Sequence, residues 1–420
     1  MTSDDRPATS GPMDGWRGRK VRLGYRYEVT LGKMLDAAKQ APDDALLLPY
    51  IRAANIQDSG LALEDVNSMP FTQGEAARLD LRSGDLLVVE GGAVGTVVRL
   101  DKDLPDWSFQ KTVNRVRARS SGSTRLLAYV LRCYRDAGYF EMLCSGSTIA
   151  HLTAEKLAAL AIPDLPVQEQ DAIADFLDVQ TARIDTLIGK QAKLITTLRE
   201  RRGAVISDAV TAGPPTTRFG TAMRRIDDRK PGISLPLMSV SQTRGVVRRS
   251  ELTDKPARAD SLDEYKICQQ GDIVFNKMSI RAGAMGVARE DGLVTYHYEV
   301  MRPIGEACAD YIVYLMKSAW FTGELISRER GIGAGNTANV RTTEVPFSTL
   351  RTIAAYIPEP GEQRRISQTL DQQTNAIDAL ILRCERHIAL AKERRAALIA
   401  ATVTGQIDVR TAGRAAQGAA

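Results

Sequence analysis

The sequence has few cysteines, few histidines and no long apolar run. Five cysteines without Cys-x-x-Cys spacing predict reduced thiols and argue against a disulfide or zinc framework; they are Cys133, Cys144, Cys268, Cys308 and Cys384. Because His151, His297 and His387 are isolated, we expect no metal site. No stretch approaches the roughly 20 apolar residues of a membrane-spanning helix. Residues 1–15 lack an apolar centre, so we expect a disordered tail, no secretory signal and a cytoplasmic protein.

Catalytic motifs are missing as well. No Asp/Asn-Pro-Pro-Tyr/Phe tetrapeptide, which amino-methyltransferases use to hold an exocyclic amine, occurs in the chain. There is also no GxxxxGK[ST] phosphate loop. The glycine-rich run Gly331–Gly335 does not lie between a clear strand and helix, which favours a flexible loop over a cofactor site. We therefore expect no catalytic residues and no cofactor in this chain.

The composition is that of an ordinary globular protein, with 44% hydrophobic and 25% charged residues among 420. Its length suits two or three domains. A net charge of +5 permits a nucleic-acid partner without requiring one, because phosphate binding depends on local basic patches.

An internal repeat is the strongest feature. Residues 169–211 and 362–404 match without gaps at a constant offset, and the identical pairs include Glu169/Glu362, Gln170/Gln363, Leu177/Leu370, Asp178/Asp371, Thr181/Thr374, Ile184/Ile377, Asp185/Asp378, Leu187/Leu380 and Arg201/Arg394. So long a match indicates a tandem duplication.

Each copy is predicted to be one long helix. Prolines precede each copy and none falls inside, while Gly213 and Gly405 follow the ends. About 42 residues without a break far exceeds the usual globular helix, so the two copies are expected to pair as an antiparallel coiled coil. The predicted seam comprises Leu177, Ile184, Leu187, Leu194, Leu198 and Val205 in the first helix, and Leu370, Ile377, Leu380 and Leu398 in the second. The adjoining Ile188, Ile195, Ile381 and Ile388 would widen it.

The segments before the helices repeat more loosely. Leu48-Pro49 corresponds to Leu235-Pro236, and Gly84-Asp85 to Gly271-Asp272, each Gly-Asp opening a β-rich run. The chain is therefore predicted to be an α/β protein of two related globular domains joined by two long helices. The predicted divisions are a tail 1–15, domain 16–165, helix 166–213, domain 214–357, helix 358–406 and tail 407–420.

These features resemble the specificity subunit of type I restriction-modification systems over roughly residues 20–410. The Ile-Pro…Glu-Gln helix entries, the stretch Ile51-Arg52-Ala53-Ala54-Asn55 and the Gly84–Val88 strand carry the resemblance. It implies target recognition domains that each read half of a split double-stranded DNA site, in a phage defence system. It also implies helices that act as a spacer and dock two modification (methyltransferase) subunits. The restriction/translocase and modification partners would carry the S-adenosylmethionine, ATP and Mg²⁺ chemistry.

The two domains differ at the strand ends, so family base contacts do not transfer by position. The second has Gln269-Gln270 and Asn276-Lys277-Met278 where the first has Arg82-Ser83 and Glu90-Gly91. Arginine and lysine suit guanine edges, asparagine and glutamine suit adenine edges, and phosphates need only charge and donors. The candidate DNA-binding residues are Arg52, Asn55, Gln57, Gln110, Lys111, Asn114, Arg115 and Arg117 in the first domain, and Gln242, Arg244, Arg248, Arg249, Asn276, Lys277, Arg281, Asn336 and Asn339 in the second.

Two other readings stay open at this point. One is a fused methyltransferase-nuclease of related architecture, which the missing catalytic motifs disfavour. The other is a coiled-coil interaction scaffold with no DNA role, which the duplicated domains disfavour. A spacer of about 42 helical residues would span roughly 63 Å, enough for grooves one to two DNA turns apart. Four residues inserted near Gly213 are expected to lengthen the gap between half-sites by one or two base pairs.

Overall fold

The computed structural model describes residues 11–34, 45–119, 122–144, 151–254, 262–328 and 345–410. By its internal contacts the chain divides into two compact units. Unit 1 comprises 1–190 and 387–420, and unit 2 comprises 191–386. Each unit combines one globular domain with part of both long helices, so the unit boundary crosses each helix. The finer division into tails, domains and helices stays a prediction. Among the described residues, no helix is both long and apolar enough to cross a membrane.

Unit 1 is built on a four-stranded antiparallel sheet in the order β2-β10-β7-β8. A smaller sheet, β6-β3-β9, adds a second layer. The strands are β1 (Lys20–Arg22), β2 (Tyr27–Leu31), β3 (Leu46–Ile51), β4 (Ile56–Gln57), β5 (Gly60–Leu61), β6 (Asn67–Phe71), β7 (Leu86–Val89), β8 (Val97–Arg99), β9 (Ser108–Phe109), β10 (Val113–Ala118) and β11 (Ala161–Pro163). The helices before the long one are α1 (Leu23–Arg26), α2 (Gln73–Arg78), α3 (Thr124–Asp136), α4 (Tyr139–Cys144) and α5 (Ala154–Ala158).

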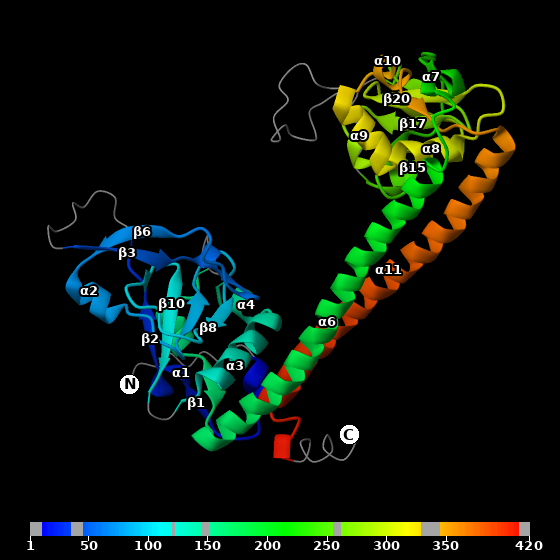
Figure 1. Ribbon diagram of the computed structural model, residues 1–420. Helices are drawn as coiled ribbons and strands as arrows, with labels where there is room; N and C mark the ends of the chain where they lie inside the picture. The colour runs from blue at the N-terminus through cyan, green and yellow to red at the C-terminus, as the bar shows by residue number, and fades with distance from the viewer. Residues whose placement is uncertain are drawn as a thin grey trace. The chain divides into compact units, whose positions relative to one another are not determined.

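Unit 2 repeats this sheet as β13-β20-β17-β18, again antiparallel throughout. Its strands are β12 (Thr217–Arg218), β13 (Met223–Ile226), β14 (Met238–Ser241), β15 (Gly245–Arg248), β16 (Lys266–Cys268), β17 (Ile273–Asn276), β18 (Met285–Val287), β19 (Gly292–Val294), β20 (Tyr298–Pro303) and β21 (Ala354–Ala355). The short helices are α7 (Phe219–Ala222), α8 (Ala309–Lys317), α9 (Ala319–Arg328) and α10 (Phe347–Leu350). Figure 1 shows strands β17 and β20 within the unit 2 domain.

The central strand of each sheet is apolar because both of its faces are covered. In β7, Leu86 and Val88 belong to the core under α3, while Leu87 and Val89 belong to the core shared with the smaller sheet. In unit 2, Ile273 and Phe275 join the core under α8, and Val274 the opposite one. A strand buried on both faces reads as a continuous apolar run, which explains the unbroken Leu-Leu-Val-Val pattern.

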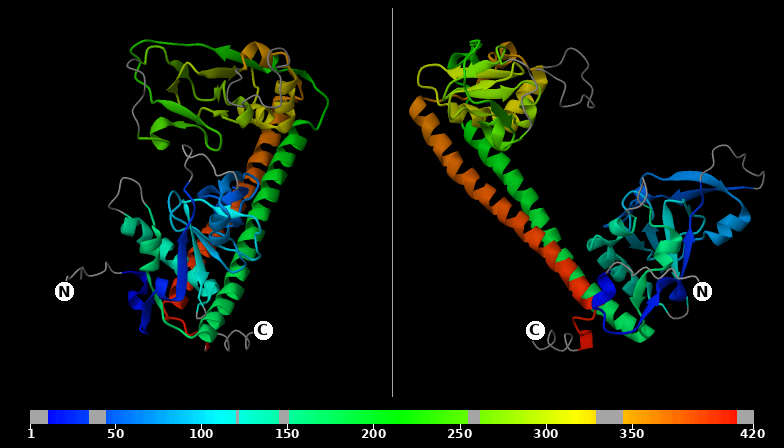
Figure 2. Two further views of the ribbon diagram at one scale, coloured as in Figure 1. Left: turned by 90° about the vertical axis from the view of Figure 1, so that its left-hand side faces the viewer. Right: turned by 180° about the vertical axis from the view of Figure 1, so that it is seen from behind.

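The two repeated segments form the long helices α6 (Val167–Val210) and α11 (Pro360–Val403), each of 44 residues. Within each unit they lie side by side (Figures 1 and 2). In unit 1 Asp185 pairs with Arg395, and in unit 2 Asp378 pairs with Arg202. Partner numbers rise in one helix as they fall in the other, so the pair is an antiparallel coiled coil. Gly405, with a φ of +74°, ends α11 in the left-handed conformation that glycine adopts readily.

The seam differs from the predicted one at three leucines. Leu187, Leu194 and Leu380 are 48%, 45% and 47% exposed, so their assignment to the seam is wrong. The buried positions of α6 alternate steps of four and three residues, and Ile188 and Ile195 fill the places assigned to the leucines. Buried or half-buried seam residues are Leu177, Ile184, Leu198 and Val205 in α6, and Leu370, Ile377 and Leu398 in α11.

Repeated polar residues attach each domain to its own long helix. The backbone N–H of Ser123 donates to Gln170 Oε1 at 2.8 Å, and that of Cys308 donates to Gln363 Oε1 at 2.8 Å. The hydroxyl of Tyr129 donates to Asp178 at 2.6 Å. In unit 2 Tyr314 donates to Asp371 at the same distance. Equivalent positions of the two long helices therefore attach the domain of each unit in the same way.

Candidate nucleic-acid interface

Loop residues gather at one end of the main sheet in both units. In unit 1 the end of β7 lies beside the start of β10, with Val89 paired to Val113. The N–H of Glu90 donates to the carbonyl of Thr112 at 2.9 Å, and Gly91 forms a bridge with His151. We call Glu90, Gly91, Gln110, Lys111, Thr112 and His151 the reading edge of unit 1.

The equivalent end of unit 2 carries different side chains on the same backbone frame. Asn276 at the end of β17 pairs with Tyr298 of β20, as Val89 pairs with Val113 in unit 1. The reading edge of unit 2 comprises Asn276, Lys277, Met278, Tyr296 and His297. The rings of Tyr296 and His297 lie 4.0 Å apart between centroids, and both side chains are exposed.

A neighbouring segment brings Arg52 to the reading edge of unit 1. The N–H of Ala53 donates to the Thr112 hydroxyl at 3.1 Å, and that of Gln110 donates to the Ile51 carbonyl at 2.9 Å. Arg52 pairs with Asp65 at 2.6 Å. Gln57, in β4, is exposed. The structure thus brings together Arg52, Gln110 and Lys111 from the predicted set.

Three predicted contacts of unit 1 are buried instead, which contradicts their assignment to DNA. Asn55, Asn114 and Arg115 are at most 3% exposed. Asn55 donates to the carbonyls of Ala62 and Asp65, each at 2.9 Å, which holds its loop. Asn114 donates to the Leu152 carbonyl, and Arg115 donates to the Asp80 carbonyl and carboxylate. These groups stabilise the domain, because a buried polar side chain needs such partners.

Arg117 is also engaged within the domain. Its guanidinium binds Asp85 through two nitrogens, and this carboxylate raises the pKa of Arg117 above its ordinary value. Residue type alone suggested a DNA contact, but the strand places the side chain beside the buried Asp85. We therefore assign Arg117 a structural role, in which it links β10 to the turn before β7.

Three of the predicted arginines of unit 2, Arg244, Arg248 and Arg249, lie on or directly after the β14–β15 hairpin, and Arg281 lies between β17 and β18. Gly245 of this hairpin lies against Gly286 of β18, which places the turn beside the edge strand of the main sheet. Arg248 binds Glu290 through two nitrogens at 2.7 and 2.6 Å, and Arg244 binds Glu251. Both pairs are exposed, so phosphate or base groups can compete for these guanidinium groups. Gln242 is exposed at the turn, and Arg249 and Arg281 are half-buried.

Two predicted residues, Asn336 and Asn339, lie outside the described residues. The side-chain oxygen of Asn276 accepts the N–H of Met278 at 3.0 Å, which leaves its amide group for other contacts. Within the described part of the chain, no group of three His, Cys, Asp or Glu side chains is placed to hold a metal ion.

Glu90 was not among the predicted residues, yet it is the most unusual group of the reading edge. It is only 9% exposed, and its Oε2 is buried without a hydrogen-bond donor. Burial raises the pKa of its carboxyl above the ordinary value, and Glu155 adds to this rise. His151, whose Nδ1 lies 4.0 Å from Oε1, and Lys111 act in the opposite direction. A sequence signal existed, since Glu90 is a charged residue directly after an apolar strand.

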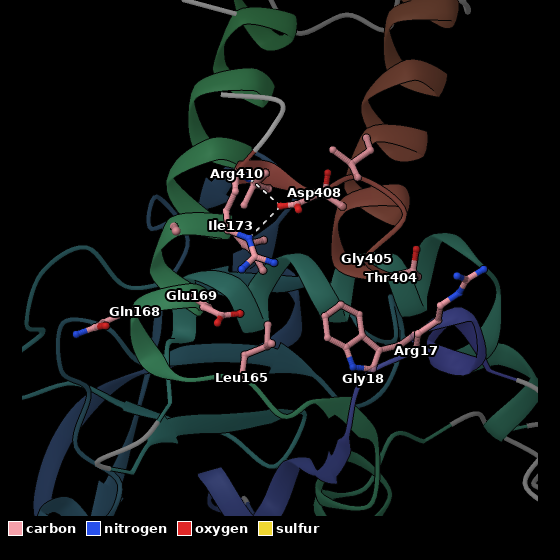
Figure 3. Close-up of a pocket in the computed structure, with 15 residues that line it drawn as sticks. Arg17, Gly18, Leu165, Gln168, Glu169, Ile173, Thr404, Gly405, Asp408 and Arg410 are labelled. Carbon is pink, nitrogen blue, oxygen red and sulfur yellow. Dashed lines mark hydrogen bonds and ion pairs between the residues drawn. The ribbon is translucent and has the colours of Figure 1, made fainter. Parts of the chain in front are cut away.

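A separate hollow of about 360 Å³ lies in unit 1 where α6 begins and α11 ends (Figure 3). Its walls include Leu165, Ile173 and Gly405, and Arg410 pairs with Asp408 at its rim. Trp16 also packs against Gly405, which ties the start of the chain to the end of α11. None of the predicted DNA-binding residues lines this hollow.

The comparisons agree on the class of protein. Residues 27–196 match the family described as Type I restriction modification DNA specificity domain, which covers the domain of unit 1 and much of α6. The chain is therefore a DNA-sequence specificity protein built on two repeated domains. The matched part, which holds the domain of unit 1, belongs to the DNA specificity domains of type I restriction-modification systems, and the specificity subunits of those systems are their non-catalytic members.

Solved structures show the same fold at low identity. A chain from work on complex assembly and conformational transition of the type I R-M system aligns with a TM-score of 0.69 and 17% identity. That alignment covers 94% of this chain and 99% of the other. The HsdS subunit from Thermoanaerobacter tengcongensis aligns with a TM-score of 0.53 and 18% identity, covering 96% of this chain and 99% of the other. No curated protein sequence matches the chain.

Proposed function

We propose that the two reading edges recognise the two halves of a split double-stranded DNA sequence, one half for each unit. One observation carries this proposal: two equivalent sheet ends present different side chains on a duplicated frame. Unit 1 has Glu90 and Lys111 where unit 2 has Lys277 and Tyr296. Different donors and acceptors on one frame select different bases.

Methylation-sensitive sequencing of cells that carry the complete system tests this function. The expected result is one modified motif with two specific parts separated by a fixed number of unspecified bases. Replacing the residues of one reading edge by alanine should alter one part alone. A motif of a single continuous part, or changes in both parts from one edge, would contradict the proposal.

The exposed leucines of the long helices support a second proposal, that each unit docks one modification subunit. Leu187 in unit 1 and Leu380 in unit 2 are equivalent in the repeat, and each is about half exposed on its helix. The attachments of the domain use other positions of the helix, such as Asp178 and Thr181. Two equivalent apolar surfaces suit two copies of the same partner. Restriction/translocase subunits would then join through these partners.

Native mass spectrometry of the co-expressed complex tests the docking. The chain should carry two modification subunits, and Leu187→Glu with Leu380→Glu should weaken their binding at least tenfold. The matched control is Thr186→Glu with Ala379→Glu, which adds the same charge at neighbouring exposed positions of the same helices. Equal loss in both double variants would show a general effect of charge rather than a docking surface.

We further propose that this chain holds no cofactor and that its partners supply S-adenosylmethionine, ATP and Mg²⁺ chemistry in the cytoplasm. The missing catalytic tetrapeptide and phosphate loop support this. The chain alone, incubated with DNA, S-adenosylmethionine, ATP and Mg²⁺, should neither methylate nor cleave. Turnover by the pure chain would contradict the assignment of this chemistry to the partners.

A further inference from the structure

Glu90 combines two properties that do not normally occur together in a stable domain. It lies at the end of β7, on the reading edge, where its own N–H and carbonyl are tied to Thr112 and Leu152. Its backbone is therefore fixed. Yet the carboxylate oxygen Oε2 is buried and receives no donor.

A buried acceptor left without a donor destabilises the fold, and a buried charge destabilises it more. No group inside the described domain donates to Oε2, and His151 Nδ1 lies 4.0 Å from the other oxygen, on a ring that is itself half exposed. A Cβ atom at Gly91 would lie 3.1 Å from the His151 ring, so the imidazole lies close against the backbone next to Glu90. A rotation of the Glu90 side chain would let its carboxylate accept from a donor outside the domain without a change of fold.

The chemistry of DNA narrows which donor this is. Phosphates present only acceptors and repel a carboxylate, so Glu90 does not serve backbone binding. In the major groove the exocyclic amines of adenine and cytosine are the donors. Adenine places the acceptor N7 beside its amine, which would repel a carboxylate, whereas cytosine presents its N4 amine without an adjoining acceptor. The exposed Lys111 precedes Thr112, and its positive charge offsets part of the negative charge of Glu90. This reduces the repulsion between Glu90 and the DNA phosphates.

We propose that Glu90 is a specificity-determining residue that reads a cytosine in the first half-site, with its carboxylate accepting a hydrogen bond from the N4 amine. This inference rests on the proposed reading of split DNA. It assigns one base class to one residue. Unit 2 carries Lys277 at the equivalent position, directly after the strand paired as Asn276 to Tyr298.

The test uses the complete co-expressed system and sequencing of modified DNA in cells. Glu90→Leu removes the unsatisfied acceptor while it keeps similar bulk, and Glu90→Gln adds a donor that suits adenine. Glu90→Leu is expected to lower the preference for cytosine at one position of the first half-site by roughly tenfold or more. Glu90→Gln is expected to admit adenine there. The second half-site should stay the same in both, and the exposed Glu155→Gln, on the same side of the domain, is the matched control.

The outcomes separate this inference from the proposed function. A wild-type motif in two parts that has no cytosine in the first part overturns it. So does an unchanged motif in Glu90→Gln and Glu90→Leu, which would assign Oε2 to a buried water. If Glu90→Leu fails to assemble, the isosteric Glu90→Gln decides the matter. A wild-type system without a two-part motif would instead contradict the proposed function itself.

Discussion

Arg117 and Asp85 form a bidentate ion pair in unit 1, with the guanidinium Nε and Nη2 each 2.7 Å from a carboxylate oxygen. Arg302 and Asp272 form the same pair in unit 2, at 2.7 and 2.8 Å. Each aspartate also accepts the N–H of the residue three positions before it, Arg82 or Gln269. The aspartate of each Gly-Asp thus joins the turn before the central strand to the neighbouring strand, β10 in unit 1 and β20 in unit 2. This holds together the strands whose ends form the reading edge.

Replacing Asp85 by asparagine should strongly destabilise unit 1. Asp85 is buried, and breaking a buried ion pair costs about 3–5 kcal/mol because one charge loses its partner. Denaturant unfolding together with hydrogen exchange resolved by peptide measures the change in each unit. The control is Asp101→Asn, whose ion pair with Arg99 is exposed and should contribute less than about 1 kcal/mol. Equal effects of the two variants would contradict the framing role of Asp85.

Replacing Gln170 by alanine should loosen the attachment of the unit 1 domain to α6. Gln170 accepts the Ser123 N–H at 2.8 Å and donates to the Leu165 carbonyl at 2.7 Å. Leaving these buried groups unpaired is expected to cost about 1–3 kcal/mol. Hydrogen exchange should accelerate around Ser123 and Leu165, with no change around Gln363. The exposed Gln168→Ala is the control, and acceleration there of the same size would refute the specific role of Gln170.

The raised pKa of Glu90 predicts a pH-dependent effect on stability. When the folded pKa lies above the unfolded one, the native state binds more protons, so the contribution to stability is lost as pH rises through the folded pKa. Glu90→Gln removes this titration. The free energy of unfolding of Glu90→Gln should therefore gain on the wild type as pH rises from below 4.5, with His151, Glu155 and Lys111 present in both. A difference that shrinks with rising pH would contradict the raised pKa.

The long helices predict how the motif responds to added length. One heptad inserted after Lys193 in α6 and another after Arg386 in α11 keeps the seam intact and adds about 10 Å to each helix. Sequencing of modified DNA should then show about three more unspecified base pairs, with both half-sites unchanged. The control is a heptad in α6 alone, which puts the seams out of register and should reduce assembly. Unchanged spacing with full activity in the double insertion would refute the spacer role.

The duplication made much of the fold predictable from the sequence. An ungapped repeat with apolar periodicity identifies α6 and α11 and their pairing, and the Gly-Asp runs identify the central strands β7 and β17. From the sequence, Leu187 and Leu194 are predicted to lie in the seam, one residue before Ile188 and Ile195, which occupy it. Each leucine and the isoleucine after it are consecutive apolar residues, so the pattern alone fits either choice. Only the packing of the partner helix decides between them.

The candidate site was less predictable, because a polar residue type does not reveal its partner. Arg115 and Asn114 lie on a strand whose neighbours come from distant parts of the chain, and those neighbours bury them. The carbonyl of Leu152 and the carboxylate of Asp80 were not visible as partners in the sequence. Glu90 was not predicted, because an acidic residue is not an expected DNA contact. Only its burial and the missing donor to Oε2, which the structure shows, identify it as a candidate.

The two reading edges differ in charge at equivalent positions, with Glu90 in unit 1 and Lys277 in unit 2, so the two units are not interchangeable. Both units share the Gly-Asp turn and the tyrosine, Tyr129 or Tyr314, that binds the long helix. The exposed leucines proposed to dock partners, Leu187 and Leu380, also lie at equivalent positions. The backbone of either half-site could thus fit the frame of either unit equally well. Glu90 in one unit and Lys277 in the other break that equivalence. Exchanging the few residues of the two reading edges should reverse the order of the half-sites along the DNA while every surface used by the partners is retained.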